Sequence, residues 1–342
     1  MTATRLKPPP ATLADTFSLY VPSRDTATLG VVESVADAVT VKGSNGPTVV
    51  RELRRNGWDT PVVFDRAGYD GRTQEIEPER WFDDQASAGA DRLLTAGTWV
   101  AWGPDDANLA RAIEVEAARC DGRPEVTAVF AIDHRWLTKR PMDLADALTA
   151  LGRPAALVPA HQADPLGQSN AVHGLIALTR NVNDLSILRT DHGGIGALAH
   201  GARHAAIGLI GSYRHFVPPG VSGRGKTDDR SPRLFVRPLM DWFTAATIAG
   251  WTTDRVNLRC HLECCRGQGL DRFFDPRHDA EAVIHNRFTL KQLADDILDA
   301  PTHERAHRFR QLCLEALDHY GPMGKLSMIT EPKLQLNQWA LA

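Results

Sequence analysis

Short apolar runs alternate with helical patterns along the first two thirds of the chain, and this alternation limits the possible folds more than any other feature. Runs such as VTAVFAID are almost continuously apolar, as is typical of parallel strands buried on both faces. Stretches such as DDANLARAIEVEAARC lie between them and have helical spacing. The sequence predicts eight strands, at residues 17–21, 38–42, 61–65, 92–95, 126–133, 155–161, 185–189 and 205–211.

Eight strands separated by helices predict an α/β fold, a (β/α)8 TIM-like barrel. The segments after the barrel predict a C-terminal helical zinc-binding module, for the reasons given below. A doubly wound open sheet is the alternative, because periodicity does not show whether a sheet closes. We expect three parts along the chain: a Pro-rich lead-in over 1–15, the barrel over 16–250 and the C-terminal module over 251–342.

The alternation stops after the eighth strand. A long basic loop rich in Gly, Pro and Arg is expected at residues 212–234, because its sequence is too polar to pack a core. Helical patterns follow at 237–251, 280–298 and 303–320.

The composition is that of a soluble globular protein, with 43% hydrophobic and 24% charged residues. No apolar run reaches the roughly 18 residues that a membrane-spanning helix needs, and the start of the chain has no apolar core of signal-peptide type. Five cysteines without even spacing argue against a disulfide framework. We therefore expect a cytoplasmic protein that has no membrane partner.

The net charge of -3 is unevenly distributed. Residues 203–278 hold twelve Arg or Lys against seven Asp or Glu, so this segment carries about +5 and the remainder about -8. A basic strip of this kind is typical of a phosphate-binding face, and a solvated Arg-rich surface is the ordinary alternative. Within it, Arg224 and Lys226 of the long loop are candidates for contacts with a nucleic-acid backbone.

Polar side chains gather at the predicted strand ends, where a barrel places its reactive groups. Carboxylates from different strands that share a pocket have pKa values pulled apart by desolvation and repulsion, as a nucleophile and an acid/base require. Each Asp can instead simply cap the following helix. The candidates are Asp65, Asp133 with His134, His161 with Gln162, Asp191 with His192, and the group Ser212, Tyr213, Arg214 and His215.

A catalytic metal is not expected. Zinc hydrolases built on barrels usually carry a His-x-His pair on the first strand, where this chain has FSLYV, and the sequence contains no HExxH helix.

Three of the five cysteines, Cys260, Cys264 and Cys265, fall within six positions. His285 follows early in a predicted helix, and His261 is an alternative ligand. Three thiolates and one imidazole predict a closed structural zinc site with no position left for water. The alternatives are free buried cysteines or a strained disulfide between Cys264 and Cys265.

The cysteine segment and the following HNRFTLKQLADDI resemble the tRNA-guanine transglycosylase (queuine/archaeosine transglycosylase-like) superfamily. That family is a (β/α)8 barrel with a zinc module after its last strands, patterned Cys-x-Cys-x2-Cys and then a helix that begins His-Asn. Here His285 and Asn286 stand in the expected place. Leu262 stands where the family has its middle cysteine, so either Cys264 replaces it by a register shift, His261 does, or the site is weakened.

Further segments of the barrel are similar to the family. FDRAGYDG implies Asp65 as the acid/base and Tyr69 as the aromatic that stacks on a purine. VFAIDHRW implies that Asp133 recognises the base. Gln162, with His161 beside it, corresponds to the glutamine on the family's sixth strand. The segment ALAHGARHAAIGL aligns with the family's nucleophile turn, and Ala206 stands where the nucleophilic aspartate would be.

The resemblance implies a transferase, a glycosyltransferase of pentosyl groups in which a carboxylate attacks C1′, guanine leaves and a 7-deazaguanine takes its place. Our first hypothesis is a protein that exchanges or cleaves a purine-type base at a nucleoside in tRNA or DNA, with Asp65 or Asp191 as nucleophile. The second is a catalytically silent paralogue that binds nucleic acid, as a homodimer or with a catalytic partner. The third is an unrelated barrel enzyme for a small phosphorylated substrate.

Overall fold

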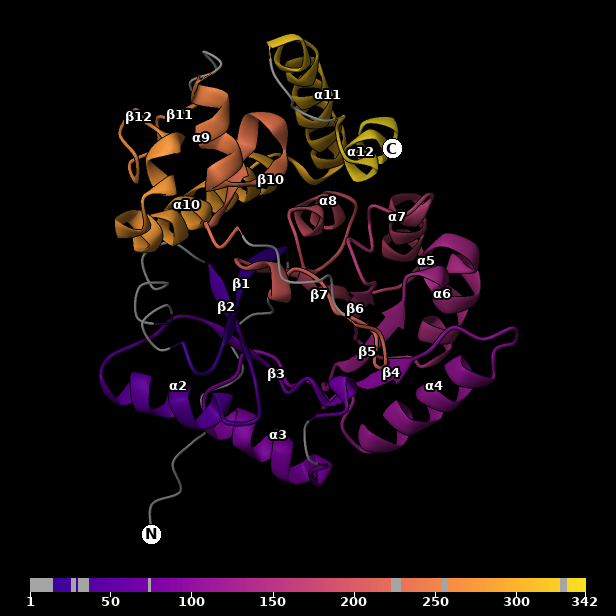
Figure 1. The fold of residues 1–342 in the computed structure, drawn as a ribbon. Coiled ribbons are helices and arrows are strands. Elements are labelled where there is room, and N and C mark those ends of the chain that lie inside the picture. The colour runs from indigo at the N-terminus through magenta and orange to yellow at the C-terminus, as the bar shows by residue number, and fades with distance from the viewer. Residues whose placement is uncertain are drawn as a thin grey trace.

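The computed structural model describes residues 15–25, 29, 37–72, 75–222, 229–253, 258–326 and 331–342. Its core is one parallel sheet of eight strands, curled on itself (Figure 1), in the order β3-β2-β1-β8-β7-β6-β5-β4. The strands are β1 (Thr16–Pro22), β2 (Ala38–Lys42), β3 (Val62–Asp65), β4 (Thr98–Val100), β5 (Ala128–Asp133), β6 (Ala155–Ala160), β7 (Leu185–Thr190) and β8 (His204–Gly208).

The strand order distinguishes the two predicted architectures. Each strand pairs with its neighbours in sequence except at β3 and β4, which are the two edges of the sheet, and β1 pairs in parallel with both β2 and β8. A doubly wound sheet instead reverses its order at a switch point. The cyclic order is therefore consistent with the predicted (β/α)8 barrel.

The remaining gap lies between the edge strands β3 and β4, and the segment 91–95 joins β3 to the residue just before β5. Isolated parallel bridges join Val63 to Arg92 and Leu94 to Thr127. The amide of Asp91 donates to the Val62 carbonyl, and that of Thr95 to the Thr127 carbonyl. The strand predicted at 92–95 thus forms only two bridges, while the extended strand β4 comes three residues later, after Gly97 with φ +89°.

Helices cover the outer face of the sheet (Figure 1), in the order expected of alternating strands and helices. Prolines stand in the first turn of α2, α3 and α6, where a missing backbone N–H costs no hydrogen bond. The helices are α2 (Gly46–Arg55), α3 (Pro78–Ser87), α4 (Ala107–Arg119), α5 (Arg135–Lys139), α6 (Pro141–Ala150), α7 (Ala171–Asn181) and α8 (Gly193–Ala199).

After β8 the chain forms hairpins and helices beside β1 and α8 (Figure 1). The helix predicted at 237–251 is wrong in its first half, where DWFT forms a strand, because aromatic and β-branched residues favour a hairpin pairing over a helix. The elements are β9 (Arg233–Val236), β10 (Asp241–Thr244), α9 (Ala245–Thr253), β11 (Arg259–Cys260), β12 (Gln268–Gly269), α10 (Asp279–Leu298), α11 (Thr302–Leu326) and α12 (Leu334–Leu341).

Short 3-10 turns complete the fold at Gly68–Asp70, Gly211–Tyr213, Arg237–Leu239, Leu270–Phe274 and Pro276–His278. Within the described residues, the helices are all too short or too polar to cross a membrane.

The amino-terminal end of the sheet interior contains a buried polar group. Ser18 Oγ lies 2.8 Å from both Thr40 Oγ1 and His204 Nε2. His204 is 1% exposed, and burial together with the charge of Arg92 lowers the pKa of its imidazole to about 3. This histidine is therefore neutral in the folded protein at pH 7.

The neutral His204 makes stability dependent on pH. Its pKa is lower in the folded chain than the usual 6.5, so the unfolded chain binds the extra proton between pH 6.5 and pH 3. We expect this residue to remove up to about 1.4 kcal/mol of unfolding free energy for each pH unit below 6.5. Urea unfolding at pH 7 and pH 5, in the wild type and in His204→Asn, measures the difference. Equal losses in the two proteins would contradict the assignment.

Candidate metal centre and barrel mouth

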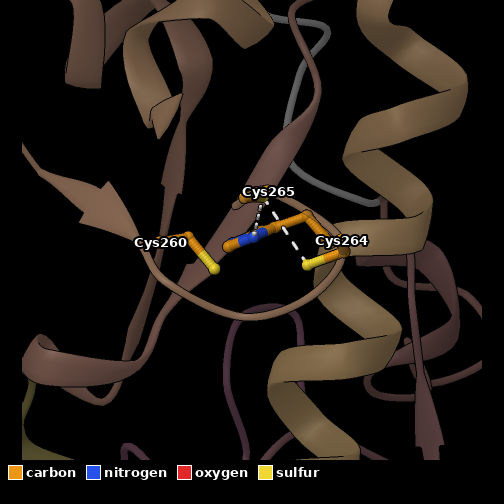
Figure 2. A group of neighbouring side chains, drawn as sticks. Cys260, Cys264 and Cys265 are labelled. Atoms are coloured by element: carbon orange, nitrogen blue, oxygen red, sulfur yellow. Dashed lines mark hydrogen bonds between the residues drawn. The ribbon is translucent and has the colours of Figure 1, made fainter. Parts of the chain in front are cut away.

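Three cysteines and one histidine converge between β11 and α10 (Figure 2). Cys260 ends β11, Cys264 and Cys265 lie in the following turn, and His285 comes from the second turn of α10. The three sulfurs and one ring nitrogen of His285 all lie within 4.8 Å of one another. These four groups are positioned to hold a metal ion.

The distances fit a tetrahedral site. Zn–S bonds of about 2.3 Å and Zn–N bonds of about 2.0–2.1 Å give tetrahedron edges of about 3.8 Å between sulfurs and about 3.5 Å from sulfur to nitrogen. Here Cys264 Sγ lies 3.6 Å from Cys265 Sγ, which lies 3.4 Å from His285 Nδ1. A disulfide would need about 2.05 Å between the sulfurs. All five cysteines are free, so the predicted alternative of a Cys264–Cys265 bridge is wrong.

The backbone explains which residues of this segment face the cluster. The Leu262 carbonyl accepts the amides of Cys265 and Arg266, and the Gly267 amide donates to the Cys260 carbonyl. Arg266 and Gly267 both have positive φ, which turns the chain back tightly. Leu262 therefore closes the turn with its carbonyl, and Cys264 brings the third thiol. His261 is exposed and is not part of the cluster.

Neighbouring groups orient the ligands. His285 Nε2 lies 3.3 Å from the Phe235 carbonyl oxygen, so a proton on Nε2 leaves the Nδ1 lone pair facing the sulfurs. A metal-binding histidine usually has such a carbonyl bonded to its other ring nitrogen. Arg272 Nη2 donates to Cys265 Sγ at 3.4 Å and favours a thiolate there. Asn286 accepts the Phe235 amide at 2.8 Å, so the His-Asn pair attaches α10 to β9.

The thiols share protons among themselves. Hydrogen bonds from Cys264 and Cys265 lower the pKa of the Cys260 thiol, and the bond to Cys260 raises the pKa of Cys265 to about 11. One sulfur therefore carries negative charge while its neighbours hold protons. A divalent cation would displace those protons on binding.

At the other predicted site, Asp65 ends β3 and is fully buried. Its Oδ2 accepts hydrogen bonds from Tyr20 Oη at 2.5 Å and Tyr69 Oη at 2.7 Å, and its Oδ1 accepts the Ala67 amide at 2.8 Å. Burial and the charge of Asp65 raise the pKa of both tyrosines well above the usual value. Both phenols therefore stay protonated and act as donors.

Aromatic side chains cover this carboxylate. The Tyr69 ring meets Phe216 edge-on with centroids 5.0 Å apart, and the Tyr20 ring lies 6.0 Å from that of Tyr213. Tyr69 is 3% exposed and Phe216 4%. A base could reach Asp65 or stack on Tyr69 only after Phe216 or Tyr213 had moved.

The end of β8 is closed by backbone. A Cβ at Gly208 would lie 2.1 Å from the Tyr213 carbonyl oxygen and 2.7 Å from the Arg214 amide nitrogen. Ala206, where the resemblance would place a nucleophile, is fully buried in the sheet interior. Strand β8 therefore brings no acidic group to the carboxyl-terminal end of the curled sheet, which we call the barrel mouth.

Asp133, at the end of β5, accepts hydrogen bonds through both of its carboxylate oxygens. Arg135 binds both of its oxygens, at 2.9 and 2.8 Å, and His134 Nδ1 lies 3.2 Å away. Burial alone would raise the pKa of Asp133, but these hydrogen bonds outweigh it and lower the pKa well below its usual range. The His134 ring lies 4.4 Å from that of His161, while Gln162 is exposed and donates to the Ser222 carbonyl.

Asp191, just beyond β7, lies beneath the C-terminal helix α12. Its Oδ1 accepts Gly193 N at 2.9 Å and Gln335 Nε2 at 3.1 Å. Burial opposes ionisation, yet the charge of His192 and the Gln335 bond hold its pKa below the usual value. Burial and the Asp191 charge raise the pKa of nearby Asp164 to about 7. Arg214 also points to this side, with its guanidinium 3.8 Å from the Trp242 ring centroid.

The three candidate aspartates therefore have separate sets of partners: tyrosines for Asp65, arginine for Asp133 and the C-terminal segment for Asp191. Tyr213 lies over the Asp65 group, whereas Arg224 and Lys226 lie outside the described residues.

Two charged residues of the barrel mouth are not among the site residues predicted from the sequence. Lys42 ends β2 and Arg189 lies near the end of β7, and both line a depression there. Both are the last residues of strands that the sequence predicts, so considering basic as well as acidic strand ends would have found them.

Comparison with known proteins adds little. Neither family models nor curated protein sequences match the chain. Among solved structures, two mutants of the tryptophan synthase alpha-subunit from Pyrococcus furiosus are similar at 13% identity, with TM-scores of 0.37 and 0.36. Each alignment covers 57% of this chain and 87% of the other. At such scores the similarity carries no argument about this chain.

Proposed function

We propose that Cys260, Cys264, Cys265 and His285 hold a structural zinc ion. The support is the donor set, the tetrahedral spacing and the carbonyl behind His285. Zinc would add rigidity here, because it would tie the short β11–β12 hairpin to the middle of the C-terminal module. With four protein ligands no coordination position remains for a substrate.

We further propose that the chain is a divergent transglycosylase-like protein that acts at a purine-type base of a nucleoside in tRNA or DNA. One observation carries this proposal: a curled eight-stranded parallel sheet is followed by a Cys3His cluster whose His-Asn pair is attached to the preceding hairpin. That is the order of parts that the resemblance implies.

In this reaction a departing base needs a proton and its edge needs polar partners. Asp65, with two phenols that donate to it, is the group we assign to proton transfer. Asp133, together with His134, is the group we assign to the base edge, after its bond to Arg135 has opened. The nucleophile has no counterpart on β8. We assign this role to Asp191, because Asp65 cannot attack C1′ and protonate the departing base in the same step.

A second candidate function is a catalytically silent paralogue that binds nucleic acid, alone or beside a catalytic subunit. The feature that favours it is the end of β8, where Ala206 is buried and Gly208 lies against the Tyr213 backbone. A carboxylate on the barrel axis is missing there.

Incubation with labelled guanine and tRNA separates the two functions. Under the first, label enters tRNA, and Asp65→Asn lowers the rate by roughly 100-fold or more, because a positioned acid or base contributes about that much. Asp121→Asn, on an exposed turn, is the matched control and keeps the rate. No exchange, with tRNA binding that weakens as salt rises, supports the silent paralogue. Neither exchange nor binding overturns both.

A further inference from the structure

We propose that a phosphate-type oxyanion binds in a depression at the carboxyl ends of β1, β2 and β7. This basic depression has a volume of about 510 Å³ and is lined chiefly by Arg24, Lys42, Gly43, Asn45, Arg72 and Arg189. The inference does not depend on base exchange.

Arg189 is the first reason. It lies at a register irregularity of β7 between Ile187 and Thr190, with φ +52°, a conformation that side chains rarely adopt in a strand. It is 8% exposed, and its Nη2 donates to the Ser212 carbonyl at 2.9 Å. Its Nε and Nη1 are buried without a hydrogen-bond partner among the described residues. The guanidinium carbon lies 5.2 Å from the Phe216 ring centroid, and the guanidinium also interacts with Tyr69. Because buried guanidinium donors are normally hydrogen-bonded, we assign a ligand as the acceptor of Nε and Nη1.

Lys42 is the second reason. Burial and the neighbouring Arg189 charge both lower the pKa of its ammonium, so the two cations repel each other across the depression. The one carboxylate among the lining residues is that of Asp70, 3.7 Å from Lys42 Nζ. The buried Asp65 carboxylate also acts on Lys42 and Arg189, so four cationic side chains face two carboxylates. The excess of positive charge that remains is what an anion would neutralise.

The start of α2 adds to this field. Gly43 and Asn45 line the depression and lead directly into α2, which has no acidic residue in its first turn. The amino-terminal end of a helix carries partial positive charge, which favours phosphate groups. Gly43 has φ +121°, and a Cβ there would lie 2.8 Å from Ser23 Oγ, so glycine is needed for this close approach.

Two sources of the oxyanion fit this chemistry: the terminal phosphate of a small molecule, and a phosphodiester of a nucleic-acid strand. The depression is larger than a phosphate group and leaves room for the part to which it is attached. The experiment therefore uses inorganic phosphate, guanosine 5′-monophosphate and a short single-stranded RNA without terminal phosphates.

The test measures thermal unfolding at constant ionic strength, with chloride replaced by each probe. We expect the wild-type Tm to rise with inorganic phosphate, and Lys42→Gln to bind it roughly 10- to 100-fold more weakly, because one charge-assisted bond is lost. Without phosphate, Lys42→Gln should change the Tm little, because the lost ion pair with Asp70 offsets the repulsion from Arg189 that is removed. Arg72→Gln, an exposed position, is a second variant with the same expected direction.

Arg111→Gln on the exposed face of α4 removes the same charge elsewhere and is the control. A larger shift with guanosine 5′-monophosphate than with RNA assigns the site to a terminal phosphate, and the reverse assigns it to a strand backbone. If the three probes leave the wild type unshifted, or shift Lys42→Gln and Arg111→Gln as much as the wild type, the proposal is wrong.

Discussion

Replacing Cys265 with serine should lower the zinc content from about one ion per chain to less than roughly a tenth, and should destabilise the C-terminal module by about 4 kcal/mol or more. Cys265 is 2% exposed and has contacts with Cys264, His285 and Arg272, so its thiol is central to the cluster. Metal analysis of the purified protein and urea unfolding measure the two effects.

The matched control is Cys120→Ser, which also places a hydroxyl where a buried thiol lay. Cys120 directly follows α4 and is not part of the cluster, so this change should leave the zinc content unaltered and cost about 1–3 kcal/mol. If wild-type protein holds less than about a tenth of an equivalent, or the two variants unfold alike, the zinc proposal fails.

Replacing Gly208 with alanine should destabilise the protein by about 3 kcal/mol or more. The added Cβ would lie 2.1 Å from the Tyr213 carbonyl oxygen and 2.2 Å from its carbonyl carbon. Backbone atoms cannot rotate away as the end of a long side chain can, so the turn at Gly211–Tyr213 must lift from the end of β8. Equilibrium unfolding in urea measures the loss.

Gly250→Ala in α9 is the control for this change, and its expected effect has the opposite sign. An added Cβ there meets no atom within 4 Å, and alanine favours a helix by about 0.5–1 kcal/mol relative to glycine. An unfolding free energy that falls equally in both variants would show that the contact with Tyr213 is not what makes Gly208 necessary.

Much of the α/β core could be predicted from the sequence, because buried parallel strands are nearly continuous apolar runs. The 92–95 segment and the β10 strand show the limits. In RLLT only Arg92 and Leu94 form bridges, and the chain enters β4 only after the turn at Gly97. DWFT has a helix-like apolar pattern next to a true helix, and only its pairing with β9 makes it a strand.

The grouping of Cys260, Cys264, Cys265 and His285 could be predicted because three ligands are close in sequence and the fourth lies on a helix. The arrangement of the side chains at the barrel mouth could not be predicted. The predicted strand ends indicate which residues lie near the barrel mouth, but not the direction in which each side chain points. Asp191 lies one residue beyond β7 and turns toward α12, whereas Arg189, two residues earlier, lines the mouth because the strand is irregular there.

The pairing of β1 with both β2 and β8 has a consequence for how the chain folds. Ser18 meets Thr40 after 22 residues of chain but His204 only after 186. Closing so long a loop is entropically costly, and such distant pairings slow folding. During synthesis one edge of β1 therefore has no partner until β8 has left the ribosome, and an open edge can pair with other chains. Protection of that edge during translation is a requirement that the strand order itself imposes on this protein.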